Sequence, residues 1–142
     1  MDWHTLLEKQ ILKGDHINEF KLLKNQNVTY VRLNIFPDGG VARLRLFGDL
    51  IPFSQDLSKD LELSALKNGG KIVGYNNAHY GNVNALLSEG RGTTMGDGWE
   101  TRRRRVPGND FIIIELGTPG LISNVEIDTC HFKGNFPDRA SI

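Results

Sequence analysis

Residues 28–47 read VTYVRLNIFPDGGVARLRLF and decide the fold class of this chain. Apolar and polar residues alternate over 28–36 and again over 41–47, which is the period of a half-buried β-strand. Pro37-Asp38-Gly39-Gly40 lies between the two runs, where proline presets φ and glycine accepts a positive φ. We therefore predict a β-hairpin. Its inward side chains are expected to be Val31, Leu33, Ile35, Ala42, Leu44 and Leu46, with Arg43 and Arg45 facing solvent.

The rest of the chain also alternates short apolar runs with turns. Residues 71–75 (KIVGY) are expected to form a buried strand, and residues 121–128 (LISNVEID) a strand with one inward face. The run at 111–116 (FIIIEL) is apolar on both faces, which predicts a central strand followed by a turn at 117–120. One helical turn is expected over 82–87. Many short strands with little helix predict an all-β fold, an antiparallel β-sandwich of the jelly-roll kind.

The bulk properties exclude several classes of protein. The chain has 142 residues, enough for one domain with its own core, and 17 Lys and Arg balance 17 Asp and Glu. Zero net charge argues against a dedicated binder of nucleic acid or of membrane surfaces. No apolar run approaches the roughly 18–20 residues that span a bilayer, and the first ten residues lack a signal-peptide core. Because Cys130 is the single cysteine, we expect a reducing compartment, most simply the cytoplasm.

The most highly charged stretch is 95–111, MGDGWETRRRRVPGNDF. If this stretch is extended, Arg102 and Arg104 share one face with Glu100. Guanidinium groups beside carboxylates suit a small anionic ligand better than a polyanion. A solvated charged face without a ligand is an equally open interpretation, and a nucleic-acid patch is the least favoured because acids interleave with the arginines.

Another candidate group follows the run at 121–128. Asp128 and His131, with His79, supply carboxylate and imidazole groups for acid–base chemistry. Asp128 and His131 are also possible metal ligands, although such neighbours are more often structural. Cys130 and His131 are not expected to form a nucleophile–base pair, because alternation along a strand would put them on opposite faces. Cys130 is interpreted instead as a small core or loop thiol.

Four segments of the chain resemble the allantoicase family. DGWETRRRR at 97–105 is similar to the signature of that family, and EIDTCHFKGNFP at 126–137 is similar to its D-T-x-H-F-x-G-N-x-P motif. Residues 31–48 resemble the strand–turn–strand that closes an allantoicase repeat, and residues 69–92 resemble the opening of a repeat. Together the matches cover most of residues 28–142.

The resemblance implies a jelly-roll β-sandwich of the galactose-binding-domain-like kind, normally present twice per chain. It also implies hydrolysis of allantoate to ureidoglycolate and urea, in the degradation of purines through allantoin. Allantoate is a small carboxylate with two ureido groups, which arginines, acids and amides can hold. The resemblance leaves a divalent metal cofactor undecided and implies a homo-oligomer or a partner repeat. We expect Glu100, Asp128 and His131 to be catalytic, and Arg102, Arg104, Asp97, Trp99, Asn135 and His79 to bind substrate.

The segments occur in an unusual order. Residues 1–48 resemble the end of one repeat and residues 57–142 the beginning of the next. This order fits a fragment of a two-repeat enzyme, a circularly permuted repeat, or a dimer that exchanges the 28–47 segment. Asn77 stands where the family often has aspartate, while Asn109 and Phe111 stand where G-H-D-W is usual. An alternative function is therefore a non-catalytic module that binds small anions or ureides, or an inactive fragment.

Overall fold

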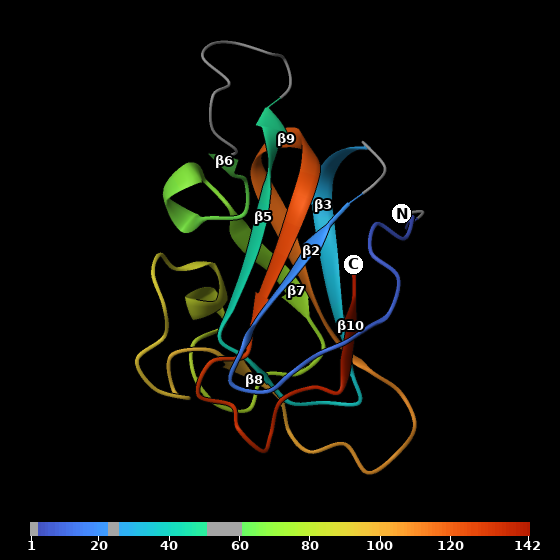
Figure 1. Cartoon of the computed structure of the whole chain (residues 1–142), viewed down its shortest axis with the longest axis vertical. Coiled ribbons are helices and arrows are strands. Elements are labelled where there is room, and N and C mark those ends of the chain that lie inside the picture. The colour runs from blue at the N-terminus through green and yellow to red at the C-terminus, as the bar shows by residue number, and fades with distance from the viewer. Residues whose placement is uncertain (1–2, 23–25, 51–60) are drawn as a thin grey trace.

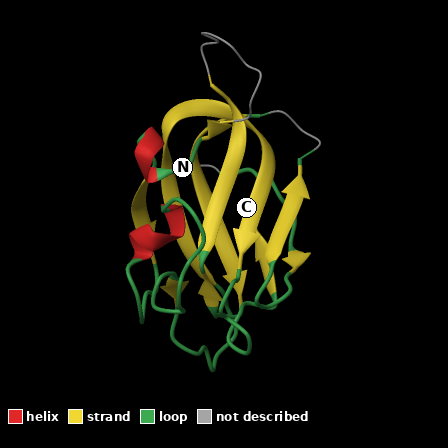
Figure 2. Cartoon of the chain, turned by 60° about the vertical axis from the view of Figure 1, so that its left-hand side comes forward, coloured by secondary structure: helices red, strands yellow, loops and turns green. Residues whose placement is uncertain are grey.

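The computed structural model describes residues 3–22, 26–50 and 61–142 of the chain. Nearly all regular structure in these residues is antiparallel β-strand, which confirms the predicted all-β sandwich (Figure 1). Two short 3-10 helices lie on one side of the strands (Figure 2). In chain order the elements are β1 (Gln10–Ile11), β2 (Ile17–Lys21), β3 (Asn27–Phe36), β4 (Gly40–Val41), β5 (Arg43–Leu50), β6 (Leu61–Glu62), η1 (Leu66–Asn68), β7 (Lys71–Tyr75), η2 (Val83–Leu87), β8 (Trp99–Glu100), β9 (Asp110–Asp128) and β10 (Arg139–Ser141).

The sandwich is built around β9, a strand of 19 residues. The first half of β9 pairs with β3 and β7, and the second half pairs with β5 and β2. Between its halves β9 arches over one end of the molecule, so that one strand contributes to both layers (Figure 1). The central position predicted for 111–116 is confirmed. The turn predicted at 117–120 is wrong, because the chain continues as strand through the arch.

Two glycines make the arch of β9 possible. A Cβ at Gly117 would come within 1.8 Å of the Asn68 carbonyl oxygen, and one at Gly120 within 2.6 Å of the Asp49 carbonyl oxygen. These glycines were interpreted as turn residues. They instead allow close approach of neighbouring backbone to a continuous strand.

The strands predicted at 28–36 and 41–47 are present, but the hairpin between them is wrong. β3 and β5 each pair with β9 and not with each other. The segment between them carries β4, which pairs with β8 instead. Alternation fixes which face of a strand is buried but not which strand lies beside it, so it could not distinguish a hairpin from two strands in different layers.

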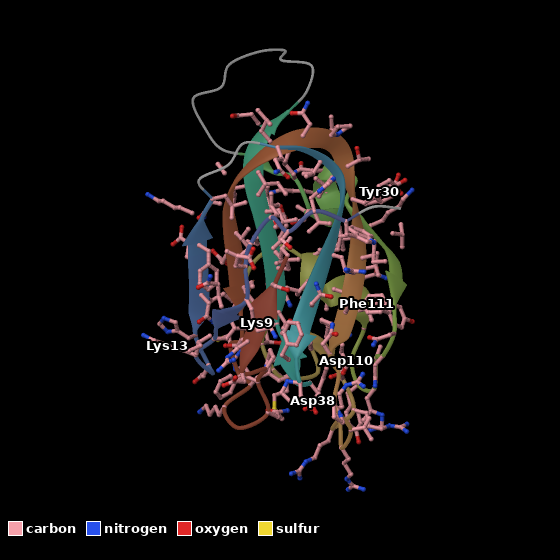
Figure 3. All side chains as sticks on the ribbon, turned by 90° about the vertical axis from the view of Figure 1, so that its right-hand side faces the viewer. Lys9, Lys13, Tyr30, Asp38, Asp110 and Phe111 are labelled. Atoms are coloured by element: carbon pink, nitrogen blue, oxygen red, sulfur yellow. The ribbon has the colours of Figure 1, made fainter. Side chains whose placement is uncertain are left out.

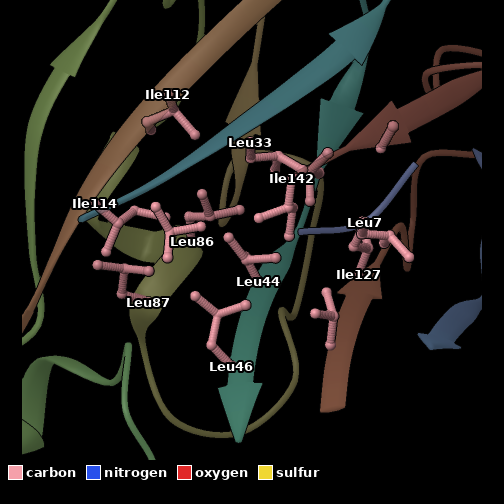
Figure 4. Packing of buried hydrophobic residues seen from close by; sticks show 14 of the residues in the cluster. Leu7, Leu33, Leu44, Leu46, Leu86, Leu87, Ile112, Ile114, Ile127 and Ile142 are labelled. Carbon is pink, nitrogen blue, oxygen red and sulfur yellow. The ribbon is translucent and has the colours of Figure 1, made fainter. Parts of the chain in front are cut away.

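The core lies between the two layers (Figure 4). All six predicted inward residues of β3 and the 41–47 run are at most 3% exposed, as predicted. η2 confirms the helical turn expected over 82–87 and buries Leu86 and Leu87. The prediction that 71–75 is buried is wrong: in the described residues β7 pairs with β9 alone, and only alternate side chains of β7 are partly covered.

The connecting segments 76–98, 101–109 and 129–138 gather at the end of the sandwich opposite the arch of β9 (Figure 1). This end carries all the side chains expected to form a site. In the ranges that the structure covers, no helix has the length and apolar character needed to cross a membrane.

Candidate functional site

The arginine stretch is not an extended strand. β8 ends at Glu100, and residues 101–109 belong to no strand. The next residue, Thr101, is held by the turn residue Gly39: its backbone N–H donates to the Gly39 carbonyl at 3.0 Å, and its hydroxyl accepts from the Gly39 N–H at 3.1 Å. The prediction that Arg102 and Arg104 share a face with Glu100 by strand alternation is therefore wrong.

Arg104 is turned inward by two acids. Its guanidinium forms an ion pair with Asp110, which is completely buried, and its backbone N–H donates to the Asp38 carboxylate. Figure 3 shows Asp38 and Asp110 at the loop-bearing end of the sandwich. By contrast, Arg102, Arg103 and Arg105 are exposed. Arg104 thus fastens the loop to the core, whereas its three arginine neighbours stay open to solvent.

Asp38 and Asp110 were missed as functional candidates. Asp38 was interpreted only as a turn residue, and Asp110 only as an acid at the edge of the arginine stretch. The available signal was the presence of acids on both sides of the four arginines, Asp97 and Glu100 before them and Asp110 after them. It indicated ion pairing, but it could not indicate which arginine is buried.

Glu100 contacts two other predicted site residues, Asn135 and His79. Its carboxylate accepts from the Asn135 side-chain amide at 2.7 Å, and its carbonyl accepts from the His79 backbone N–H at 2.8 Å. The Arg102 backbone N–H donates to the Asn77 side chain at 3.3 Å. Glu100 and Asn135 thus meet through their side chains, whereas His79 and Arg102 join Glu100 and Asn77 through backbone N–H groups.

Trp99 contacts this group through Asn77. Its ring is completely buried, and its indole N–H donates to the Asn77 carbonyl at 2.9 Å. A completely buried ring cannot contact a ligand at the surface, and its hydrogen bond instead holds the Asn77 backbone in place.

Asp97 is already occupied by a protein cation. Arg43 donates to the Asp97 carboxylate at 3.0 Å and to the Asp97 carbonyl at 2.7 Å. The prediction that Arg43 faces solvent is wrong, because the loop that carries Asp97 covers this part of β5 and leaves Arg43 only 2% exposed. Arg45 is likewise largely covered, and it pairs with Glu126.

Asp128 and His131 form a different group from Glu100. Asp128 is completely buried, and its Oδ1 accepts from the Cys130 backbone N–H at 2.7 Å. His131 receives its contacts from Asp15, which accepts its backbone N–H at 2.8 Å, and from the Gly92 carbonyl, 2.7 Å from Nε2. No hydrogen bond in the described part of the chain joins these residues to Glu100.

Cys130 does not point away from its neighbour. β9 ends at Asp128, and His131 has a φ of 72°, so strand alternation does not apply at Cys130. The side chains of Asp15, Cys130 and His131 instead bring one possible ligand atom each to within 4.8 Å of one another. Asp15 had been interpreted only as part of a turn. Because more than one hundred residues separate it from His131 in the sequence, no local pattern could indicate the contact.

A cavity of about 340 Å³ lies away from both groups, beside Trp3, Tyr30 and Arg32. None of the predicted site residues lines it. This cavity is therefore not part of the candidate site.

Comparison with known proteins identifies the family. The family model described as "Allantoicase repeat" matches residues 1–51 and 61–142. This chain belongs to the allantoicase family. The resemblance stated from its motifs is thereby confirmed.

Two relatives illustrate the extent of the similarity to allantoicases. A protein of Acinetobacter baylyi named "Probable allantoicase" is 49% identical over 140 residues, which cover 99% of this chain and 42% of the relative. A "Probable allantoicase" of Photobacterium profundum is 48% identical over 143 residues, 99% of this chain and 43% of the relative. The chain thus spans about two fifths of the length of these curated relatives. No solved structure matches it significantly.

Proposed function

We propose that this allantoicase-family chain contributes to the hydrolysis of allantoate to ureidoglycolate and urea. Two observations support the proposal: the family membership, and the names of relatives that match nearly the whole chain. The proposal depends most on the contact between two side chains. The Glu100 carboxylate lies 2.7 Å from the Asn135 amide, in the same group as the exposed Arg102.

Each of these side chains suits one part of the substrate. The Arg102 guanidinium is exposed and presents a planar fork that matches the carboxylate of allantoate. The side-chain amides of Asn77 and Asn135 offer donors and acceptors to the ureido groups. His79 is exposed at the edge of the group and can donate to a ureido oxygen.

Glu100 is the proposed proton carrier. Hydrolysis joins the oxygen of water to the carbon that carries the two ureido groups. It breaks the bond between that carbon and one ureido nitrogen. A carboxylate at this position takes the proton of the attacking water and returns it to the departing nitrogen, which leaves as urea. Asp128 and His131 lie in the other group, and a part for them in proton transfer stays a prediction.

The test of this proposal is urea release by the purified chain. We expect the wild-type chain to release urea from allantoate, and we expect Glu100→Gln to lower kcat by about 100-fold or more. Glu8→Gln changes an exposed glutamate outside the group and serves as the matched control. A folded wild-type chain that releases no urea would refute the activity of this chain.

A ureide-binding module without turnover is the second candidate. It is favoured by Asn77, because an amide there replaces the carboxylate that the family often has and already holds the Arg102 backbone. Calorimetry with allantoate distinguishes the two. Binding without urea release, weakened by Arg102→Ala, would support the binding module.

We also propose that the chain joins the end of one repeat to the beginning of the next. The family model matches in two segments, 1–51 and 61–142, which agrees with this division. β3 and β5 complete the sheet by pairing with β9 of the same chain. We therefore expect a folded monomer to exist on size-exclusion chromatography with light scattering. Folded protein found only as dimers would instead favour exchange of β3 and β5 between chains.

A further inference from the structure

We propose that Asp15, Cys130 and His131 form a binding site for a zinc-type transition-metal ion. The site is separate from the Glu100 group, and its argument does not rest on the proposed hydrolysis of allantoate. Carboxylate, thiolate and imidazole are the three ligand types that Zn²⁺ prefers in proteins. One donor atom of each lies within 4.8 Å of the others.

The donor spacing is close to that of a metal site. Zinc–ligand bonds of about 2.0–2.3 Å in tetrahedral geometry place neighbouring donors roughly 3.3–3.8 Å apart. Contraction from the observed spacing therefore requires side-chain movements of about one ångström. Asp15 is exposed, so an ion can reach the site from solvent.

The fold holds two of the ligands in unusual backbone conformations. Asp15 has a φ of 50° and His131 a φ of 72°, and these are the two non-glycine residues with positive φ in the described ranges. Their segments are joined by the hydrogen bond from the His131 backbone N–H to Asp15 Oδ1, 2.8 Å. That bond occupies one carboxylate oxygen and leaves Oδ2 available to an ion.

The imidazole of His131 is held by a backbone contact at one ring nitrogen. Its Nε2 lies 2.7 Å from the Gly92 carbonyl oxygen. Because a carbonyl oxygen only accepts hydrogen bonds, Nε2 donates in this contact, and in the neutral ring Nδ1 then has a free lone pair. A carbonyl behind one ring nitrogen is the usual support of a metal-binding histidine.

The surroundings of Cys130 attract a cation. The Asp128 carboxylate accepts the Cys130 backbone N–H at 2.7 Å, and a carboxylate oxygen of Asp15 lies within 4.8 Å of the Cys130 Sγ. Asp128 is completely buried, and its Oδ2 has no hydrogen-bond partner among the described residues. A bound divalent ion would offset this concentration of negative charge and would hold the thiol as thiolate. Three protein ligands leave a fourth position for water or for a ligand.

Cobalt substitution tests the site directly. The full chain, reduced and freed of metal, is titrated with Co²⁺, which gives a near-ultraviolet thiolate-to-cobalt absorption band only when sulfur is a ligand. We expect one equivalent of Co²⁺ with this band, displaced by one equivalent of Zn²⁺. Absence of the band in a folded, reduced wild-type chain would overturn the proposal without any variant.

Variants then assign the ligands. Cys130→Ser should abolish the band, and Asp15→Asn, which keeps an acceptor for the His131 backbone, should weaken Co²⁺ binding by about tenfold or more. His16→Gln changes an exposed histidine next to Asp15 and should bind like the wild type. Unchanged affinity in Cys130→Ser or in Asp15→Asn would show that the ion binds elsewhere. Because the readout is metal binding, its failure is independent of any failure to release urea.

Discussion

Arg43 and Asp97 form an ion pair between the first residue of β5 and the loop that leads to the candidate site. The Arg43 side chain is 3% exposed and the Asp97 side chain 35%, and Nη2 lies 3.0 Å from Oδ2. Asp97 Oδ2 also accepts the Thr93 backbone N–H at 3.2 Å. The pair therefore anchors the loop before Trp99, and through it the position of Glu100.

Removal of the Asp97 charge should destabilise the fold. Asp97→Asn leaves the buried Arg43 guanidinium without a counter-ion, and the loss of one partner of a buried pair usually costs about 3–5 kcal/mol. Because Asp97 is partly exposed, we expect roughly 2 kcal/mol in urea denaturation. Asp138→Asn is the control, since Asp138 pairs with Arg139 at the exposed surface. Equal effects of the two substitutions would show that the Arg43 pair has no structural role.

The close packing of Gly40 against Phe132 gives a second prediction. A Cβ at Gly40 would lie 1.9 Å from the ring of Phe132, which is completely buried. Gly40→Ala should therefore cost at least about 2 kcal/mol in the free energy of unfolding, because neither β4 nor the ring can move freely. Gly134→Ala, where a Cβ would meet nothing within 4 Å, should change stability by less than about 0.5 kcal/mol. A stable Gly40→Ala chain would contradict the packing of β4 on Phe132.

The buried faces of the fold could be predicted from the sequence, whereas the strand neighbours could not. Leu33 and Leu44 are completely buried, as the period of two indicates. Both lie opposite residues of β9, Ile112 and Ile127, which are distant in sequence. Alternation contains no information about such long-range pairing, so the local hairpin was preferred over the correct topology.

The residue types of the candidate site could be read from the sequence. How these residues divide into separate groups could not. Glu100 and Asn135 are in contact although 35 positions separate them, and their roles in a site stay a prediction. Arg104 and Asp97 were grouped with them by sequence proximity, yet each is bound to a protein partner. Whether an arginine meets a ligand or a buried acid depends on tertiary packing, which the sequence pattern does not reveal.

Glu62 gives a prediction of pH dependence. Burial raises the pKa of the Glu62 carboxyl above 4.5, although Arg45 and Lys67 act in the opposite direction. The folded state then keeps a proton that the unfolded state has lost, so the stability from this group is present below pH 4.5 and is lost as pH rises through the folded pKa. We expect Glu62→Gln to gain stability relative to wild type as pH rises from 4.5 towards neutrality. Thermal unfolding at several pH values measures this difference, and a constant difference would contradict the raised pKa.

Substitution of Arg104 should lower stability, whereas the same substitution of Arg102 should weaken ligand binding. Arg104→Met removes the partner of the completely buried Asp110 and should cost about 3–5 kcal/mol in urea denaturation. Arg102→Met changes an exposed side chain and should leave stability within about 0.5 kcal/mol, while it weakens allantoate binding in calorimetry. The two substitutions are chemically identical and two positions apart, so each controls for the other. Loss of stability in Arg102→Met, or its absence in Arg104→Met, would reverse the assignment of which arginine holds the loop and which meets the substrate.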